Sequence, residues 1–175
     1  MINDFNLLAT TMRGNERVMC KELLYLLKDE LGDGDAQTSK TKIRGLVVAK
    51  TLLDPFKVIE NFREILSERP YEFRYALRII PIEQIVPTDL AEIKKAAKQL
   101  TDRIEVNQSF RVTIEKRHTV LHSKDIIDVA VDGINRKVDL KNPDLILQLE
   151  IIGELTGISL IKPNDILAVI KEKLL

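Results

Sequence analysis

The sequence contains no tryptophan, one cysteine and few aromatic residues, and these shortages limit both its core and its chemistry. Aromatic residues make up 5% of the 175 residues, so the core must be built from isoleucine, leucine and valine. The single cysteine, Cys20, lies in an apolar helical pattern beside Met19 and Leu23, and no histidine is near it in sequence. We expect a structural core thiol rather than a nucleophile. One cysteine also excludes an intrachain disulfide, which fits a reducing cytosol.

An excess of charge of either sign is absent too. The 27 Lys and Arg residues equal the 27 Asp and Glu residues, and residues 1–70 alone hold 11 of each. A case for nucleic-acid binding must therefore rest on local clusters of cations. We recognise no signal peptide, and no apolar run reaches the roughly 20 residues that span a bilayer. The expected protein is cytoplasmic and has no membrane partner.

Motifs for catalysis and for metal binding are missing as well. The sequence has no glycine-rich phosphate loop, no GxSxG elbow and no cysteine cluster spaced for zinc. His118 and His122 have the spacing of a zinc-protease motif, but Thr119 stands where that motif has glutamate. Asp33 and Asp35 resemble the start of a calcium loop that lacks its later ligands, so a solvated turn is favoured. We expect no catalytic residues, no metal site and no cofactor.

Hydrophobic periodicity predicts an α+β fold with α/β-like mixed character in two parts. The first part reads as β-α-β-α-β of ferredoxin-like type, with strands at 5–11, 43–52 and 71–80. Its helices begin at Asn15 and at Asp54–Pro55, which have the residue types of helix N-caps. Pro81 and Pro87 bracket a bend, so we place an N-terminal ferredoxin-like domain at 1–80 and a second domain at 81–175, packed together.

The second part is predicted to contain a mixed sheet built around a buried hairpin. Residues 145–152 are aliphatic on both faces, as in a strand covered on two sides, and 158–161 return alongside them. A half-buried strand is expected at 110–115, with helices beginning near Asp89 and Ser123. A polar turn at 141–144 precedes the hairpin. A closing amphipathic helix is expected after Pro163, with Ile166, Leu167, Ile170 and Leu174 facing inward.

Cations gather locally in spite of the neutral total. One run comprises Arg111, Lys116, Arg117, His118, His122 and Lys124. Arg74 and Arg78 are four apart on a predicted strand and share a face, while Lys137, Lys141 and Lys162 flank the hairpin. If these segments meet at one sheet edge, they form a patch suited to phosphate. The alternative is that each cation is solvated or paired with a nearby acid, and spacing alone favours that alternative.

Four stretches together resemble the THUMP domain of RNA-modifying proteins. They are Arg78–Pro81, Phe110–His118, Lys137–Asp144 and Glu150–Leu160. The resemblance is greatest to the stand-alone THUMP proteins that serve as tRNA-binding adaptors for cytidine N4-acetylation. It covers about 71–162, and the usual N-terminal ferredoxin-like part of that family would correspond to 1–70.

The resemblance implies a non-catalytic module that binds tRNA while a partner performs the chemistry. That partner would be an RNA cytidine acetyltransferase on a separate chain, using acetyl-CoA and ATP. We expect no fused catalytic domain, because a single helix is predicted after Ile161. The residues expected to bind RNA are Arg74, Arg78, Lys116, Arg117, His118, Lys124, Lys141 and Asn142. Asp139 and Asp144 match the motif too and are expected to brace the turn, because carboxylates repel phosphate.

Other functions remain open at this point. The chain could be an RNA-binding accessory subunit of another tRNA-modifying enzyme, or a protein-interaction module without direct RNA binding. A third alternative is an enzyme that acts on RNA by itself, which would need a cofactor pocket that the sequence does not indicate.

Overall fold

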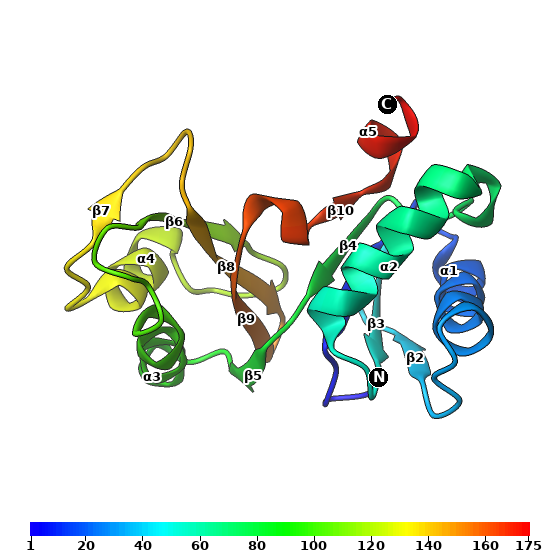
Figure 1. The fold of residues 1–175 in the computed structure, drawn as a ribbon. Coiled ribbons are helices and arrows are strands. Elements are labelled where there is room, and N and C mark those ends of the chain that lie inside the picture. The colour runs from blue at the N-terminus through cyan, green and yellow to red at the C-terminus, as the bar shows by residue number, and fades with distance from the viewer. The chain divides into compact units, whose positions relative to one another are not determined.

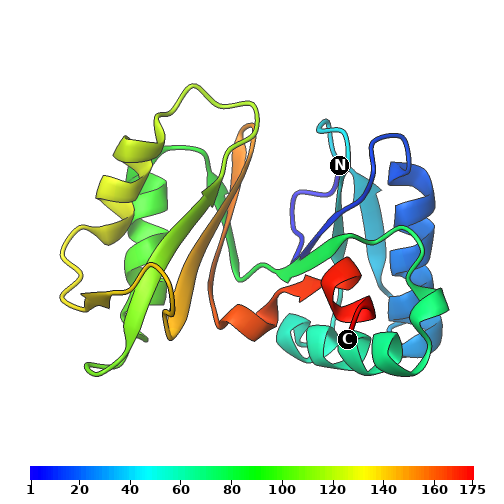
Figure 2. The ribbon, with the colours of Figure 1, turned by 90° about the horizontal axis from the view of Figure 1, so that it is seen from above.

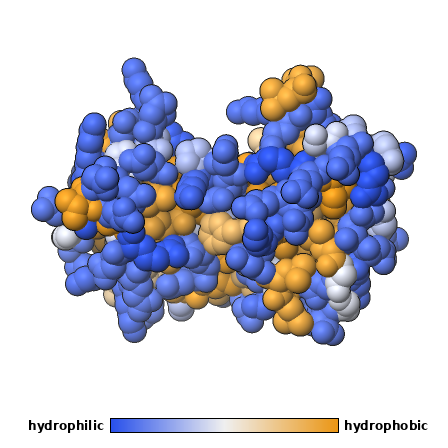
Figure 3. Space-filling model, viewed as in Figure 1, coloured by the Kyte–Doolittle hydropathy of each residue, from blue (hydrophilic) through white to orange (hydrophobic).

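The computed structural model describes residues 1–175, and the chain folds into two compact units (Figures 1 and 2). The first comprises residues 1–82 and 165–175, and the second comprises residues 83–164. Hydrophilic residues cover most of the face seen in Figure 3, with apolar residues scattered among them. None of the helices combines the length and apolar character that crossing a bilayer requires.

The first unit is a five-stranded antiparallel sheet with helices. Its elements are β1 (Leu7–Thr10), α1 (Glu16–Tyr25) continued by a π-helical turn (Leu26–Glu30), β2 (Gln37–Lys40), β3 (Leu46–Lys50), α2 (Pro55–Glu68), a 3₁₀ turn (Pro70–Glu72), β4 (Arg78–Pro81), β10 (Leu167–Ala168) and α5 (Val169–Lys173). The strand order is β10-β4-β1-β3-β2. Residues 1–82 thus form a β-α-β-β-α-β ferredoxin-like unit, which has one more strand, β2, than the sequence predicted.

The core of the first unit lies between its sheet and its two long helices. Asp54 caps α2 by accepting a hydrogen bond from the Phe56 amide, and Pro55 occupies the first helical position. The fully buried side chains of Phe62 from α2 and Leu23 from α1 join the same apolar cluster. Cys20 packs partly buried against this cluster, and burial raises the pKa of its thiol, in agreement with a structural role.

Two predictions for the first unit are wrong. Residues 71–77 are not a strand, because the Glu22 carboxylate accepts hydrogen bonds from the amides of residues 74–76 and holds them in a loop. The C-terminal residues, expected in the second domain, belong to the first unit, where Leu167 pairs with Ile79 of β4. They form a two-residue strand and a five-residue helix instead of one longer helix. Leu167 is buried as predicted, whereas Ile170 and Leu174 are exposed instead of facing inward.

The second unit is a mixed sheet with two helices on one face (Figure 2). Its elements are β5 (Gln84–Pro87), α3 (Leu90–Thr101), β6 (Ser109–Glu115), α4 (Ser123–Val131), β7 (Lys137–Val138), β8 (Leu145–Ile152) and β9 (Leu155–Ile161), followed by a 3₁₀ turn (Pro163–Asp165). The order is β5-β9-β8-β6-β7, with β6 parallel to both β7 and β8 and the other pairs antiparallel.

The predicted hairpin is confirmed as the centre of this sheet. All eight residues of β8 are buried, and β8 pairs with β9 along its whole length except its first residue. Leu147 and Leu149 of β8 pack with Ile93 of α3 and Ile126 of α4, because alternate strand residues face the helices. The Asp89 side chain caps α3 through the Glu92 amide. The mixed sheet and the α+β class are therefore confirmed.

Candidate nucleic-acid interface

The parallel pairing of β6 and β8 decides where the predicted RNA-binding residues of the second unit lie. Phe110 pairs with Leu145, and Glu115 pairs with Glu150, so the two strands point the same way. Residues 116–118 follow the C-terminal end of β6, whereas residues 141 and 142 precede the N-terminal end of β8. Five residues at about 3.3 Å each separate these edges by roughly 17 Å. The condition for a single basic patch, that these segments meet at one sheet edge, is therefore not met.

The loop after β6 is held in place by its own backbone and side chains. Lys116 Nζ donates to the Leu121 carbonyl at 3.1 Å, and the Gly153 amide donates to the Arg117 carbonyl at 2.8 Å. His118 adopts a left-handed backbone with φ of +54°, the only positive φ of a non-glycine residue in the structure. These bonds fix a strained, solvent-facing loop between the end of β6 and the β8–β9 turn.

Arg117 points back toward the sheet. Its Nη1 lies 2.8 Å from Oε2 of Glu150, whose side chain is 0% exposed, and the Arg117 side chain is only 17% exposed. Gln148 donates to the other carboxylate oxygen of Glu150 at 2.9 Å. A buried carboxylate must be paired in this way, because leaving it uncompensated is costly. Arg117, predicted to bind phosphate, is instead a structural partner of Glu150.

The exposed side chains at this edge include the cations Lys116 and Lys124 and the imidazole of His118. We call these three residues, together with the first turn of α4, the strand-end surface. No side chain caps α4, so its first amide groups point toward solvent with the positive end of the helix dipole. Lys124 forms an exposed i,i+4 pair with Asp128 at 3.0 Å, which raises the pKa of Lys124. Exposed ion pairs of this kind are weak, so the Lys124 ammonium can leave Asp128 and bind another anion.

The opposite edge carries the turn surface, which we define as Lys137, Lys141 and Asn142; all three are exposed. Asp139 accepts hydrogen bonds from the amides of Lys141 and Asn142, and these bonds lower its pKa. Asp144 Oδ2 accepts from the Ser109 amide at 2.8 Å. Both aspartates therefore brace the turn as predicted.

Arg74 and Arg78 belong to the first unit. Arg74 lies on the loop held by Glu22, while Arg78 begins β4 opposite Thr10 of β1. They do not share a strand face, which corrects the prediction, but both lie toward the same edge of the first sheet.

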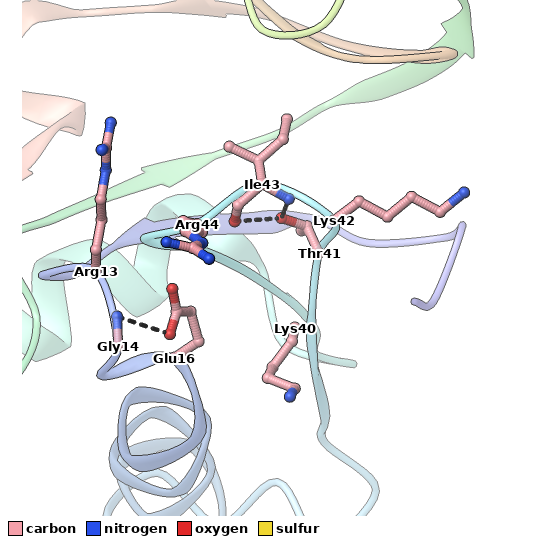
Figure 4. A pocket seen from close by; sticks show the side chains of 8 residues that line it. All are labelled: Arg13, Gly14, Glu16, Lys40, Thr41, Lys42, Ile43 and Arg44. Atoms are coloured by element: carbon pink, nitrogen blue, oxygen red, sulfur yellow. Dashed lines mark hydrogen bonds between the residues drawn. The ribbon is translucent and has the colours of Figure 1, made fainter.

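A cationic pocket at this edge was not predicted. It has a volume of about 480 Å³ and lies between the β1–α1 turn and the β2–β3 turn (Figure 4). Its lining includes Arg13, Lys40, Lys42 and Arg44. The alternation of cations at 40, 42 and 44 is the signal in the sequence that could have found it. Elsewhere, no cluster of three or more His, Cys, Asp or Glu side chains could hold a metal ion.

Comparison with known families identifies the second unit. Residues 87–161 match the THUMP domain, and this range lies wholly within residues 83–164. The THUMP domain that the sequence resemblance predicted is thus confirmed. An uncharacterised protein of Schizosaccharomyces pombe is 30% identical over an alignment of 118 residues, and the match covers 63% of this chain and 41% of that protein.

Solved structures share the fold over both units. A protein of Pyrococcus horikoshii has a TM-score of 0.63 and 20% identity, covering 91% of this chain and 55% of the other. TrmN from Thermus thermophilus has a TM-score of 0.61 and 20% identity, covering 92% and 47%. A 4-thiouridine synthetase bound to RNA and ATP has a TM-score of 0.54 and 14% identity, covering 90% and 41%. This chain spans about half the length, or less, of these proteins.

Proposed function

We propose that this chain is a non-catalytic tRNA-binding adaptor that presents tRNA to a separate RNA cytidine acetyltransferase for N4-acetylcytidine formation. The THUMP domain supports an RNA-binding role related to tRNA modification. A further support is that one protein of the same fold was solved as a 4-thiouridine synthetase in complex with RNA. The acetyltransferase follows from the sequence resemblance at residues 137–144 and 110–118.

The observation that carries RNA binding is the strand-end surface. Lys116, His118 and Lys124 stand exposed around the uncapped start of α4, on a loop that hydrogen bonds hold in place. A phosphate oxygen accepts hydrogen bonds from ammonium groups and from helix N-terminal amides. A site of this kind contacts the RNA backbone and positions it, without reading its bases.

The polar groups behind this surface support a non-catalytic role. Glu150 is buried and lies opposite Glu115, the last residue of β6, and both of its carboxylate oxygens accept hydrogen bonds, from Arg117 and Gln148. A general base must instead be within reach of a substrate proton. In the proposal, the chemistry therefore belongs to the partner.

Nucleoside mass spectrometry of tRNA from cells lacking this protein tests the proposal. N4-acetylcytidine is expected to disappear and to return with the wild-type chain, but not with the Lys116→Glu, Lys124→Glu double variant. An unchanged level of N4-acetylcytidine would contradict the proposal that the partner is an acetyltransferase. Loss of a different modified nucleoside would instead favour an accessory subunit of another tRNA-modifying enzyme.

A further inference from the structure

The cationic pocket of the first unit lies outside the THUMP match and has no role in the function proposed above. We call it the hairpin pocket; its lining residues are Arg13, Gly14, Glu16, Lys40, Thr41, Lys42, Ile43 and Arg44. Four of these eight residues are cationic and one is acidic, which gives a local charge of about +3 in a chain whose total is zero. This is the kind of local clustering that a neutral sequence conceals.

The one acid in the hairpin pocket is occupied by the backbone. Glu16 Oε1 accepts a hydrogen bond from the Gly45 amide at 2.7 Å, and Oε2 accepts from the Gly14 amide at 3.0 Å. These bonds lower the pKa of Glu16 and keep it ionised. The carboxylate thus ties the two turns together and forms no ion pair with any of the four cations.

The cations themselves have no ion-pair partners. Other cations of this unit are engaged: Lys50 pairs with Asp4, and Arg69 pairs with Glu30. In contrast, the side chains of Arg13, Lys40, Lys42 and Arg44 form no ion pair and no hydrogen bond, and all four residues are exposed. An anion that approaches them therefore displaces water rather than a protein carboxylate.

The backbone beneath the pocket is rigid. Gly45 has a φ of +79°, and a β-carbon there would lie 2.8 Å from the Thr11 carbonyl oxygen, so only glycine allows the two turns to approach this closely. The Thr11 amide donates to the Gly45 carbonyl at 2.9 Å. Thr41 Oγ1 accepts from the Ile43 amide and lies 2.9 Å from the Leu46 carbonyl, which fixes the β2–β3 turn.

The direction of the side chains indicates the shape of the ligand. Figure 4 shows Arg13, Lys40 and Lys42 extending from the walls in different directions rather than converging on one point. A single small anion would reach one or two of them, whereas a chain of phosphates could pass over several. The only apolar side chain of the lining is Ile43, so the pocket offers little surface on which a base could stack.

We propose that the hairpin pocket is a second RNA-binding site, which contacts the sugar–phosphate backbone of tRNA without reading its sequence. The proposal rests on the tRNA binding proposed above, and it adds contacts from Arg13, Lys40, Lys42 and Arg44 on a different unit. Long, mobile cations around an open pocket suit such positioning contacts.

Fluorescence polarisation of labelled tRNA against the full chain over a range of salt concentrations tests this site. The pocket variant carries Lys42→Gln with Arg44→Gln. The matched control carries Lys28→Gln with Lys57→Gln, which removes the same charge from exposed positions of the same unit outside the pocket lining. We expect the pocket variant to bind tRNA about tenfold more weakly and its salt slope to be shallower by about 1.5, since each lost phosphate contact removes roughly 0.7 to 0.9. The control should match wild type.

The possible outcomes separate this proposal from the function on which it rests. Equal tRNA affinity of the pocket variant and the control overturns the second site and leaves the adaptor proposal standing. Absence of tRNA binding by the wild-type chain overturns both. Saturable shifts of the Gly14 and Thr41 amides with inorganic phosphate, combined with unchanged tRNA affinity of the pocket variant, assign the pocket to a free anion and also overturn the proposal.

Discussion

The guanidinium of Arg117 lies 2.8 Å from the carboxylate of Glu150, which is fully buried on the central strand of the THUMP sheet. The pair connects the loop after β6 to the neighbouring strand β8. It also removes Arg117 from solvent, and Arg117 is the one arginine in the run Lys116–His118 that was predicted to bind phosphate. The positive charge at this edge is therefore provided by Lys116 and Lys124, and the role of Arg117 is to hold the loop against the sheet.

Replacing Arg117 should destabilise the fold. Arg117→Ala leaves the Glu150 carboxylate buried without its cation, and breaking a buried pair costs on the order of 3 kcal/mol. Chemical denaturation should report a lower midpoint with an unchanged slope. Lys137→Ala is the control, and we expect it to stay within about 0.5 kcal/mol of wild type because its side chain is exposed. Equal stability of the two variants would contradict the structural role of Arg117.

The two hydrogen bonds that the Glu16 carboxylate accepts should make the stability of the fold depend on pH. Backbone hydrogen bonds from Gly45 and Gly14 lower the pKa of Glu16 from its ordinary value of 4.5. A lowered pKa means that its stabilisation is present above pH 4.5 and is lost as the pH falls through the folded-state pKa. Thermal unfolding of Glu16→Gln should thus show a lower Tm than wild type at pH 7, and this difference in Tm should narrow as the pH falls below 4.5 and through the folded-state pKa. A gap that stays constant from pH 7 to pH 3 would refute the assignment.

Gly45→Ala should lower the stability of the first unit by more than Gly133→Ala lowers that of the second unit. Both glycines have a positive φ, +79° at Gly45 and +76° at Gly133, so both variants lose about 1 kcal/mol or slightly more to backbone strain. Only at Gly45 would the new β-carbon meet another atom, 2.8 Å from the Thr11 carbonyl. Denaturation midpoints of the two variants measure the difference, and a larger effect at Gly133 would count against the close approach of the two turns.

Asp144→Ala should loosen the turn before β8. Asp144 accepts hydrogen bonds from both the amide and the hydroxyl of Ser109, and its own amide donates to that hydroxyl at 3.1 Å. Losing the carboxylate should cost about 1 kcal/mol. Hydrogen exchange should become faster at the Ser109 amide, while the distant Gly153 amide serves as an internal control. Unaltered exchange at Ser109 would show that the carboxylate is not the brace.

Strong local signals predicted much of the fold. The apolar run of β8 and the glycine-containing turn after it identified the central hairpin, and Asp54 and Asp89 marked the starts of α2 and α3 through their capping chemistry. The strands β2, β5, β7 and β10 were missed, because they contain only two to four residues; β5 lies where a bend between Pro81 and Pro87 was expected. In addition, β5, β7 and β10 pair with strands distant in sequence. The run at 71–77 has the aromatic residues of a strand, but Glu22 binds its amides instead.

The candidate site was less predictable, because it depends on the direction of strands. A strand at 110–115, a helix from Ser123 and a strand at 145–152 form a unit whose crossover helix favours parallel pairing. Parallel pairing places the residues after β6 and those before β8 at opposite edges. Composition could not show that Arg117 faces a buried glutamate, since that depends on the register that sets Glu115 beside Glu150.

In the proposed function, this chain binds tRNA through the strand-end surface of its THUMP domain. The most direct test compares the tRNA affinities of two double variants that change the same amount of charge at different places. Lys116→Glu with Lys124→Glu alters the strand-end surface, and Lys137→Glu with Lys141→Glu alters the turn surface roughly 17 Å away. We predict that the first pair lowers tRNA affinity at least about tenfold, with a shallower salt slope, while the second pair has a clearly smaller effect. Wild-type affinity in the strand-end variant, with intact folding by circular dichroism, would contradict the account.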